Sequence, residues 1–184
     1  LEKEIEEIVQ VVAYRHCDAA EGLDFSTAVD LTDKLQNGLI YWDIPEGVWR
    51  LCIMIRTDVA FGKGGRFSYY IDMLEKESCK AMIDAVYEPH YQHFKEYFGN
   101  TFAGFFSDEP QYFRWGFPYT RVLPAYFQKT YGEDLLDRIG LLFVEKEGFR
   151  DLRYKYWRAM QELMLENYAK KIYDWCDKYG YKLT

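Results

Sequence analysis

The chain has 184 residues, of which 49% are hydrophobic and 19% aromatic, and this is enough apolar material for a domain with a substantial core. A formal net charge of −7 and a pI near 5.1 argue against nucleic acid or an anionic membrane surface as a partner. No apolar run approaches the roughly 18 residues of a membrane span. The many aromatic residues allow two interpretations: a heavy core, or rings that stack on a flat ligand such as a sugar.

Residues 1–57 predict a β-rich segment. A stretch of β-branched residues at 8–16 is typical of a strand, and so is the alternation of apolar and polar side chains at 49–57. Between them, Asn37-Gly38 is a strong signal for a tight turn, and a further strand is expected at 39–44.

Residues 58–184 predict alternating helices and strands. An apolar stripe with helical spacing runs from 75 to 98, a continuous apolar run follows at 101–107, and a long helix is expected at about 150–179, before another strand from 181. Together with the strand at 49–57, this order is β-α-β-α-β, which requires parallel strands joined by helices. We therefore predict an α/β fold.

The cysteines are widely spread and form no C-x-x-C pair, so we interpret them as reduced thiols, most of them packing residues. They are Cys17, Cys52, Cys79 and Cys176. This usage slightly favours the cytoplasm, although the compartment stays open. The chain starts without methionine, in a charged stretch with no hydrophobic leader, so we expect it to be part of a longer protein.

The apolar run at 101–107 ends in two acidic residues, Asp108 and Glu109, which are followed by Pro110. In parallel α/β folds, functional groups lie where strands end and loops open onto a common mouth. A carboxyl group held there, beside a second carboxylate, is expected to have a raised pKa, as a general acid near neutral pH requires. The alternative is a solvated acidic turn at the end of a strand.

The sequence Gly-Phe-Phe-Ser-Asp-Glu-Pro at 104–110, with the residues before it, resembles the central barrel segment of certain bacterial glycoside hydrolases. These are of the family 2-like and α-L-rhamnosidase (family 106-like) type. The shared pattern begins with Tyr70, Asp72 and Leu74, and continues through Phe-Gly-Asn-Thr at 98–101. The resemblance implies a partial (β/α)8 TIM barrel preceded by a small β-rich region, and hydrolysis of glycosidic bonds, with α-L-rhamnosides as the leading substrate.

The resemblance also implies that Glu109 is the general acid, with Asp108 beside it. Relatives usually have Asn-Glu-Pro, so Asp108 leaves open whether the reaction retains or inverts configuration. The second carboxylate is expected on a later strand, about 5 Å away in a retaining enzyme and roughly 6.5–9.5 Å in an inverting one. A whole barrel needs at least about 200 residues, so we expect this piece to be inactive alone and to self-associate through exposed barrel edges.

Candidate sugar-binding residues flank the acidic pair. Tyr112, Arg114 and Trp115 come after it. The rings of Tyr112 and Trp115 suit stacking on a sugar, or alternatively cover the barrel rim, and the Arg114 guanidinium suits a contact with a hydroxyl group. Before it comes Asp72, accompanied by Tyr70. Asp72 is either an acceptor for a sugar hydroxyl or a residue that makes local hydrogen bonds at the start of a helix.

Other functional classes stay open. One is a non-catalytic carbohydrate-binding relative, in which the acidic pair only hydrogen-bonds sugar, and another is an unrelated α/β domain with an acidic strand end. His90 and His93 lie three positions apart, a spacing that suits a metal, but no third ligand is evident, so we interpret them as core or surface histidines. No metal and no cofactor are expected.

Overall fold

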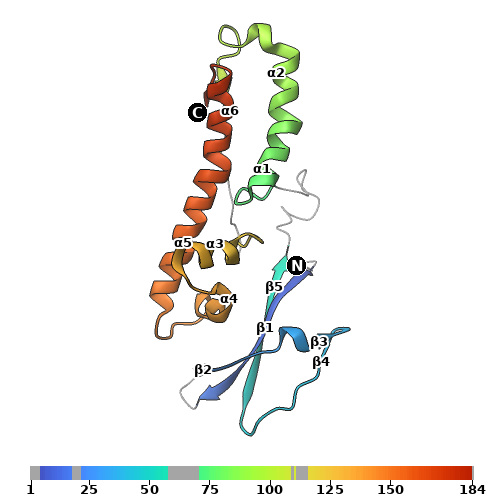
Figure 1. Ribbon diagram of the computed structural model, residues 1–184, viewed down its shortest axis with the longest axis vertical. Coiled ribbons are helices and arrows are strands. Elements are labelled where there is room, and N and C mark those ends of the chain that lie inside the picture. Colours follow the sequence, from blue (N-terminus) through green and yellow to red (C-terminus); the bar gives the residue numbers. More distant parts are fainter. Residues whose placement is uncertain (1–4, 18–21, 58–70, 109, 111–115, 184) are drawn as a thin grey trace. The chain divides into compact units, whose positions relative to one another are not determined.

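The computed structural model describes residues 5–17, 22–57, 71–108, 110 and 116–183. The chain divides into two compact units, Leu1–Ala60 and Phe61–Thr184. The first contains a small antiparallel sheet, and the second contains helices and a parallel pair of strands (Figure 1). The protein is therefore of mixed α/β composition, in agreement with the predicted class. In the described part of the chain, no helix is long and apolar enough to cross a membrane.

The sheet of the first unit has β1 (Ile5–Cys17) at its centre, between β2 (Gly22–Asp30) and β5 (Trp49–Thr57). The strands predicted at 8–16 and 49–57 are confirmed. The central strand is the most buried, with Val11 and Ala13 fully inaccessible to solvent. Strand β2 was not predicted because its sequence contains Gly, Asp and Ser, which are poor strand formers, and it becomes a strand through its pairing with β1.

A short hairpin lies between β2 and β5 in the sequence. After a 3-10 turn at Thr32–Lys34, β3 (Leu35–Gln36) pairs with β4 (Leu39–Ile40). Asn37 and Gly38 have φ angles of 51° and 77°, as a two-residue hairpin turn with positive φ requires, and this confirms the predicted turn. The strand predicted at 39–44 ends early because β3 offers only two residues for pairing.

The predicted β-α-β-α-β order was wrong at its first strand. β5 runs antiparallel to β1, with Ile53 opposite Val11, and belongs to the first unit. The alternation along β5 is typical of an antiparallel strand with one face partly solvated, whereas a buried parallel strand has a continuous apolar run. In β5, however, the apolar side chains of Leu51, Ile53 and Ile55 are about half exposed, and the intervening positions are the less exposed ones.

Two long helical segments pack side by side in the second unit (Figure 1). They confirm the helices predicted at 75–98 and at about 150–179. Each segment consists of two α-helices joined by a π-helical turn. The first comprises α1 (Lys76–Met82), the π turn Ile83–Tyr87 and α2 (Glu88–Phe94), and ends in a 3-10 turn at Lys95–Tyr97. The second comprises α5 (Phe149–Met164), the π turn Leu165–Ala169 and α6 (Lys170–Lys178).

Shorter helices fill the stretch before α5. They are α3 (Leu123–Tyr131), α4 (Leu135–Arg138) and a 3-10 turn at Ile139–Leu142. Phe127 of α3 is fully buried, as is Leu152 of α5. The Tyr156 hydroxyl of α5 donates a hydrogen bond to the carbonyl of Pro118, which ties the loop before α3 to the long helix.

The first π turn changes which residues of its helix are buried. The predicted stripe ran through Val86, His90 and Phe94, but Tyr87 is buried instead, while Val86 and Phe94 are each 43% exposed. A π turn closes with hydrogen bonds over five residues rather than four, so the inward face moves on by one position. Pro89 explains the turn, because it has no N–H for the carbonyl four residues earlier and its ring crowds that carbonyl.

The parallel pair consists of β6 (Gly104–Phe105) and β7 (Lys182–Leu183). The strand expected from 181 is confirmed, and so is its parallel direction. The strand predicted at 101–107 is present over two residues only. Its partner in the described structure, β7, is itself only two residues long. Within the described residues this is the one parallel pair, and they form no closed barrel.

Gly104 is required by the close approach of these two strands. A β-carbon at this position would lie 2.2 Å from the Lys182 carbonyl oxygen, a backbone atom that cannot swing aside. We expect Gly104→Ala to force β6 and β7 apart and to lower the free energy of unfolding by about 1–3 kcal/mol, measured by urea denaturation. Ala103→Ser, at the exposed neighbouring position, is the control. Equal stability of the two variants would contradict this packing.

Candidate functional site at the end of strand β6

The acidic pair begins at Asp108, three residues after the end of β6. Ser107 is half-buried, and its Oγ lies 2.9 Å from the Tyr168 hydroxyl on the long helix, so that the two hydroxyls form a hydrogen bond. Asp108 is exposed. Glu109, the candidate acid, lies outside the described residues. The same holds for Tyr70, Tyr112, Arg114 and Trp115.

Asp72 makes local hydrogen bonds just before α1. Its Oδ1 accepts a hydrogen bond from the Leu74 backbone N–H at 2.9 Å, and its own N–H donates to Ser78 Oγ at 3.0 Å. These bonds fix the chain where it enters the helix, as one of the two interpretations of Asp72 expected. A contact between its carboxylate and a sugar hydroxyl stays a prediction.

One turn of the long helix holds both of these segments. Asn167 Nδ2 donates to the Leu74 carbonyl oxygen at 2.8 Å, and the next residue, Tyr168, bonds to Ser107. Both residues belong to the π turn Leu165–Ala169. The residues around Asp72 and the end of β6 are therefore anchored to neighbouring positions of the same helix.

Sequence reasoning did not identify Asn167, and it placed Tyr168 only in the apolar stripe of the helix. The available signal was spacing: Leu163 and Tyr168 are both buried but lie five positions apart, one more than a regular α-helix favours for residues on the same face. That interval is the mark of the π turn.

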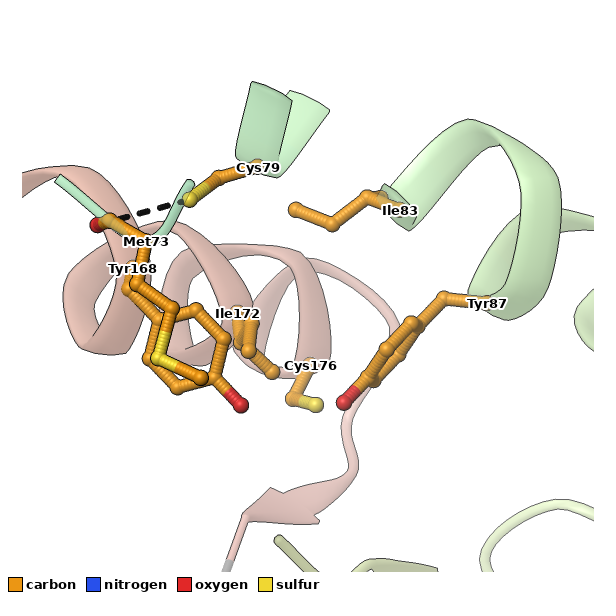
Figure 2. Close-up of a cluster of buried hydrophobic side chains, with 7 residues drawn as sticks. All are labelled: Met73, Cys79, Ile83, Tyr87, Tyr168, Ile172 and Cys176. Carbon is orange, nitrogen blue, oxygen red and sulfur yellow. Dashed lines mark hydrogen bonds between the residues drawn. The ribbon is translucent and has the colours of Figure 1, made fainter. Parts of the chain in front are cut away.

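A buried cluster lies beneath these segments, and Figure 2 shows it between the two long helices. In the figure, the Cys79 thiol points to the Met73 carbonyl oxygen, to which it donates a hydrogen bond at 3.6 Å. The residues of the cluster are Met73, Cys79, Ile83, Tyr87, Tyr168, Ile172 and Cys176.

Three ionisable groups of this cluster, those of Cys79, Tyr87 and Cys176, favour their neutral forms. Burial, together with the nearby charges of Asp72 and Glu75, raises the pKa of the Cys79 thiol to about 11. Burial also raises the pKa of the Tyr87 hydroxyl to about 12 and raises that of the Cys176 thiol. A nucleophilic cysteine requires a thiolate, so these two thiols are packing residues, as predicted.

Many aromatic rings near β6 serve packing. The Phe105 ring lies 4.4 Å from that of Tyr87, and the Tyr91 ring lies 4.1 Å from that of Tyr179. Trp175 belongs to the same group, and its indole N–H donates to Glu88 Oε2 at 3.1 Å. These rings pack on one another around the buried Tyr87, and the other four are partly buried.

A metal site does not arise in the described part of the chain, where no three His, Cys, Asp or Glu residues lie close enough together to hold an ion. His90 and His93 are exposed, so they are surface rather than core residues, and His90 Nδ1 lies 2.6 Å from the Val86 carbonyl oxygen. All four cysteines are free thiols.

Comparison with known proteins found no matching family, no matching curated protein and no matching solved structure. The function is therefore inferred from the residues of this chain and from the arrangement of the described site.

Proposed function

We propose that this chain is part of the (β/α)8 catalytic domain of a glycoside hydrolase, in which Glu109 is the general acid and α-L-rhamnosides are the leading substrate. The observation that carries the proposal is the acidic pair that begins three residues after the end of β6, within a motif that resembles that of such enzymes. The parallel pairing of β6 with β7 and the helices between them support it, because a barrel of this kind repeats this arrangement.

The proposed chemistry follows from two carboxyl groups on opposite sides of the glycosidic bond. Glu109 protonates the leaving oxygen, while a second carboxylate from a later strand acts either as the nucleophile or as the base that activates water. The separation of the two groups decides the stereochemical outcome: about 5 Å for retention and roughly 6.5–9.5 Å for inversion. The adjacent Asp108 is exposed and is available to a substrate hydroxyl.

The sugar contacts in this proposal come from both sides of the acidic pair. Trp115 and Tyr112 supply stacking rings, which favour binding by about 1 kcal/mol each. Arg114 and Tyr70 contact hydroxyl groups, as does Asp72, which lies two residues before the Leu74 carbonyl that Asn167 holds.

The test compares the full-length protein with the isolated 184-residue chain. We expect the full-length protein to hydrolyse an aryl α-L-rhamnoside or another aryl glycoside of a panel, measured by release of the aryl alcohol. We expect the isolated chain to release none, since the second carboxylate is expected elsewhere, and to self-associate in light scattering.

Each outcome of this comparison decides something. Binding of glycosides by the full-length protein without hydrolysis would make it a non-catalytic carbohydrate-binding relative, and neither binding nor hydrolysis would refute the proposal. Turnover by the isolated chain would show that both carboxylates lie within it. A monomer in light scattering would refute the self-association.

A further inference from the structure

We infer that Tyr168 is a positioning residue for the acidic motif: its hydroxyl holds Ser107, the residue immediately before Asp108. This inference rests on the proposed function. Tyr168 itself is not expected to touch the substrate.

Tyr168 is well suited to fix another residue because its own ring is fixed. Its side chain is 8% exposed and packs in the cluster with Met73 and Ile172 (Figure 2). The hydroxyl group at the end of an immobile ring has a defined position. It bonds to Ser107 Oγ at 2.9 Å across 61 positions of sequence, and so joins the end of β6 to the long helix.

The segment before the acidic pair is held at two points. Phe105, in β6, packs its ring against Tyr87 at 4.4 Å, and Ser107, two residues later, is held by Tyr168. Both contacts are made to residues of the same buried cluster, whereas Phe106 between them is 74% exposed. Asp108 follows at once, and Glu109 is two residues beyond Ser107.

The π turn supports the same assignment. Turns of this kind are rare inside α-helices and are often found at functional sites, because the additional residue changes the direction of the side chains that follow. Here the turn lets consecutive residues, Asn167 and Tyr168, bond to two segments far apart in sequence, at Leu74 and Ser107. A regular α-helix would take Tyr168 away from Ser107.

Catalysis by a general acid depends on the distance between the acid and the oxygen that it protonates. A general acid must lie within about 2.6–3.2 Å of the oxygen that it protonates, and a misplacement of about 1 Å can cost as much as 10²-fold in rate. Loss of the Ser107–Tyr168 bond frees the chain two residues from the acid. The loss of rate should therefore depend on how much the substrate needs the proton.

The experiment uses Tyr168→Phe in the full-length protein, because this change removes the hydroxyl and keeps the ring. For glycosides with poor leaving groups we expect kcat to fall roughly tenfold, with KM within about twofold of wild type. For aryl glycosides with good leaving groups, kcat should fall by less than about threefold. Ser107→Ala should give the same pattern, and the double variant should be no worse than either single one, since both remove the same bond.

Tyr87→Phe is the matched control, because it removes the hydroxyl of another buried tyrosine in the same cluster and keeps the ring that packs on Phe105. It should leave the dependence on the leaving group unchanged. Equal losses of kcat on both kinds of substrate in Tyr168→Phe, or additive losses in the double variant, would overturn the inference and leave Tyr168 a packing residue.

Glu109→Gln, assayed on the same substrates, separates failure of the inference from failure of the proposed function. If Glu109→Gln loses rate mainly on poor leaving groups and Tyr168→Phe behaves like wild type, only the inference is wrong. If Glu109→Gln shows no dependence on the leaving group, or the wild type hydrolyses no glycoside, the proposed function is wrong and the inference falls with it.

Discussion

Replacement of Glu109 by glutamine in the full-length protein is expected to lower turnover of natural glycosides by about 10²- to 10⁴-fold, the usual contribution of general acid catalysis. Glutamine has nearly the same shape as the protonated acid but cannot give up a proton. Aryl glycosides with good leaving groups need little protonation, so their turnover should be largely retained. Steady-state kinetics on the two kinds of substrate measure both effects.

The control for this prediction is Glu147→Gln, which removes one negative charge from an exposed position after the 3-10 turn Ile139–Leu142. It should have wild-type kinetics on both kinds of substrate. Should Glu109→Gln slow both kinds equally, Glu109 would not be the proton donor, whatever else it contributes.

Replacement of Ile172 by alanine is expected to give the largest loss of stability among these variants. Ile172 is 0% exposed and lies in the middle of the cluster that joins the two long helices (Figure 2). Removing its side chain takes away buried methyl and methylene groups and leaves a cavity that rigid helices cannot close. The free energy of unfolding should fall by about 2–5 kcal/mol.

The matched control is Tyr173→Ala, at the next position of the same helix, because Tyr173 is 58% exposed. Its effect should stay within about 0.5 kcal/mol. Urea unfolding followed by circular dichroism measures both variants, and several protein concentrations are needed because association adds to apparent stability. If Ile172→Ala is no less stable than Tyr173→Ala, the cluster is not the core of this unit.

The long helices were predictable because their burial pattern is local. In the segment 150–179, buried residues recur at nearly helical intervals, and the predicted Leu152, Tyr156 and Met160 are buried. In the segment 75–98 the prediction failed after the π turn, where Tyr87 replaced Val86 in the core. A search for helical spacing assumes a regular helix, so it misplaces the buried residues that follow a π turn such as the one before Pro89.

The strands show a different limit. Apolar alternation identified 49–57 as a strand, but alternation does not name a partner, and β5 was assigned to a parallel sheet although it pairs with β1. β2 was missed because its residues are weak strand formers until a neighbour supplies the hydrogen bonds. Strand pairing joins residues that are distant in sequence, so a local pattern does not identify the partner of a strand.

By itself, the sequence determined the two long helices and the tight turn at Asn37-Gly38, because each depends on neighbours within a few residues. Tertiary structure alone decided the anchors of the site. The bonds from Tyr168 to Ser107 and from Asn167 to Leu74 join residues 61 and 93 positions apart, so no local pattern reports them. They arise because the two long helices pack on a common cluster, which brings one turn of the second helix against two distant segments.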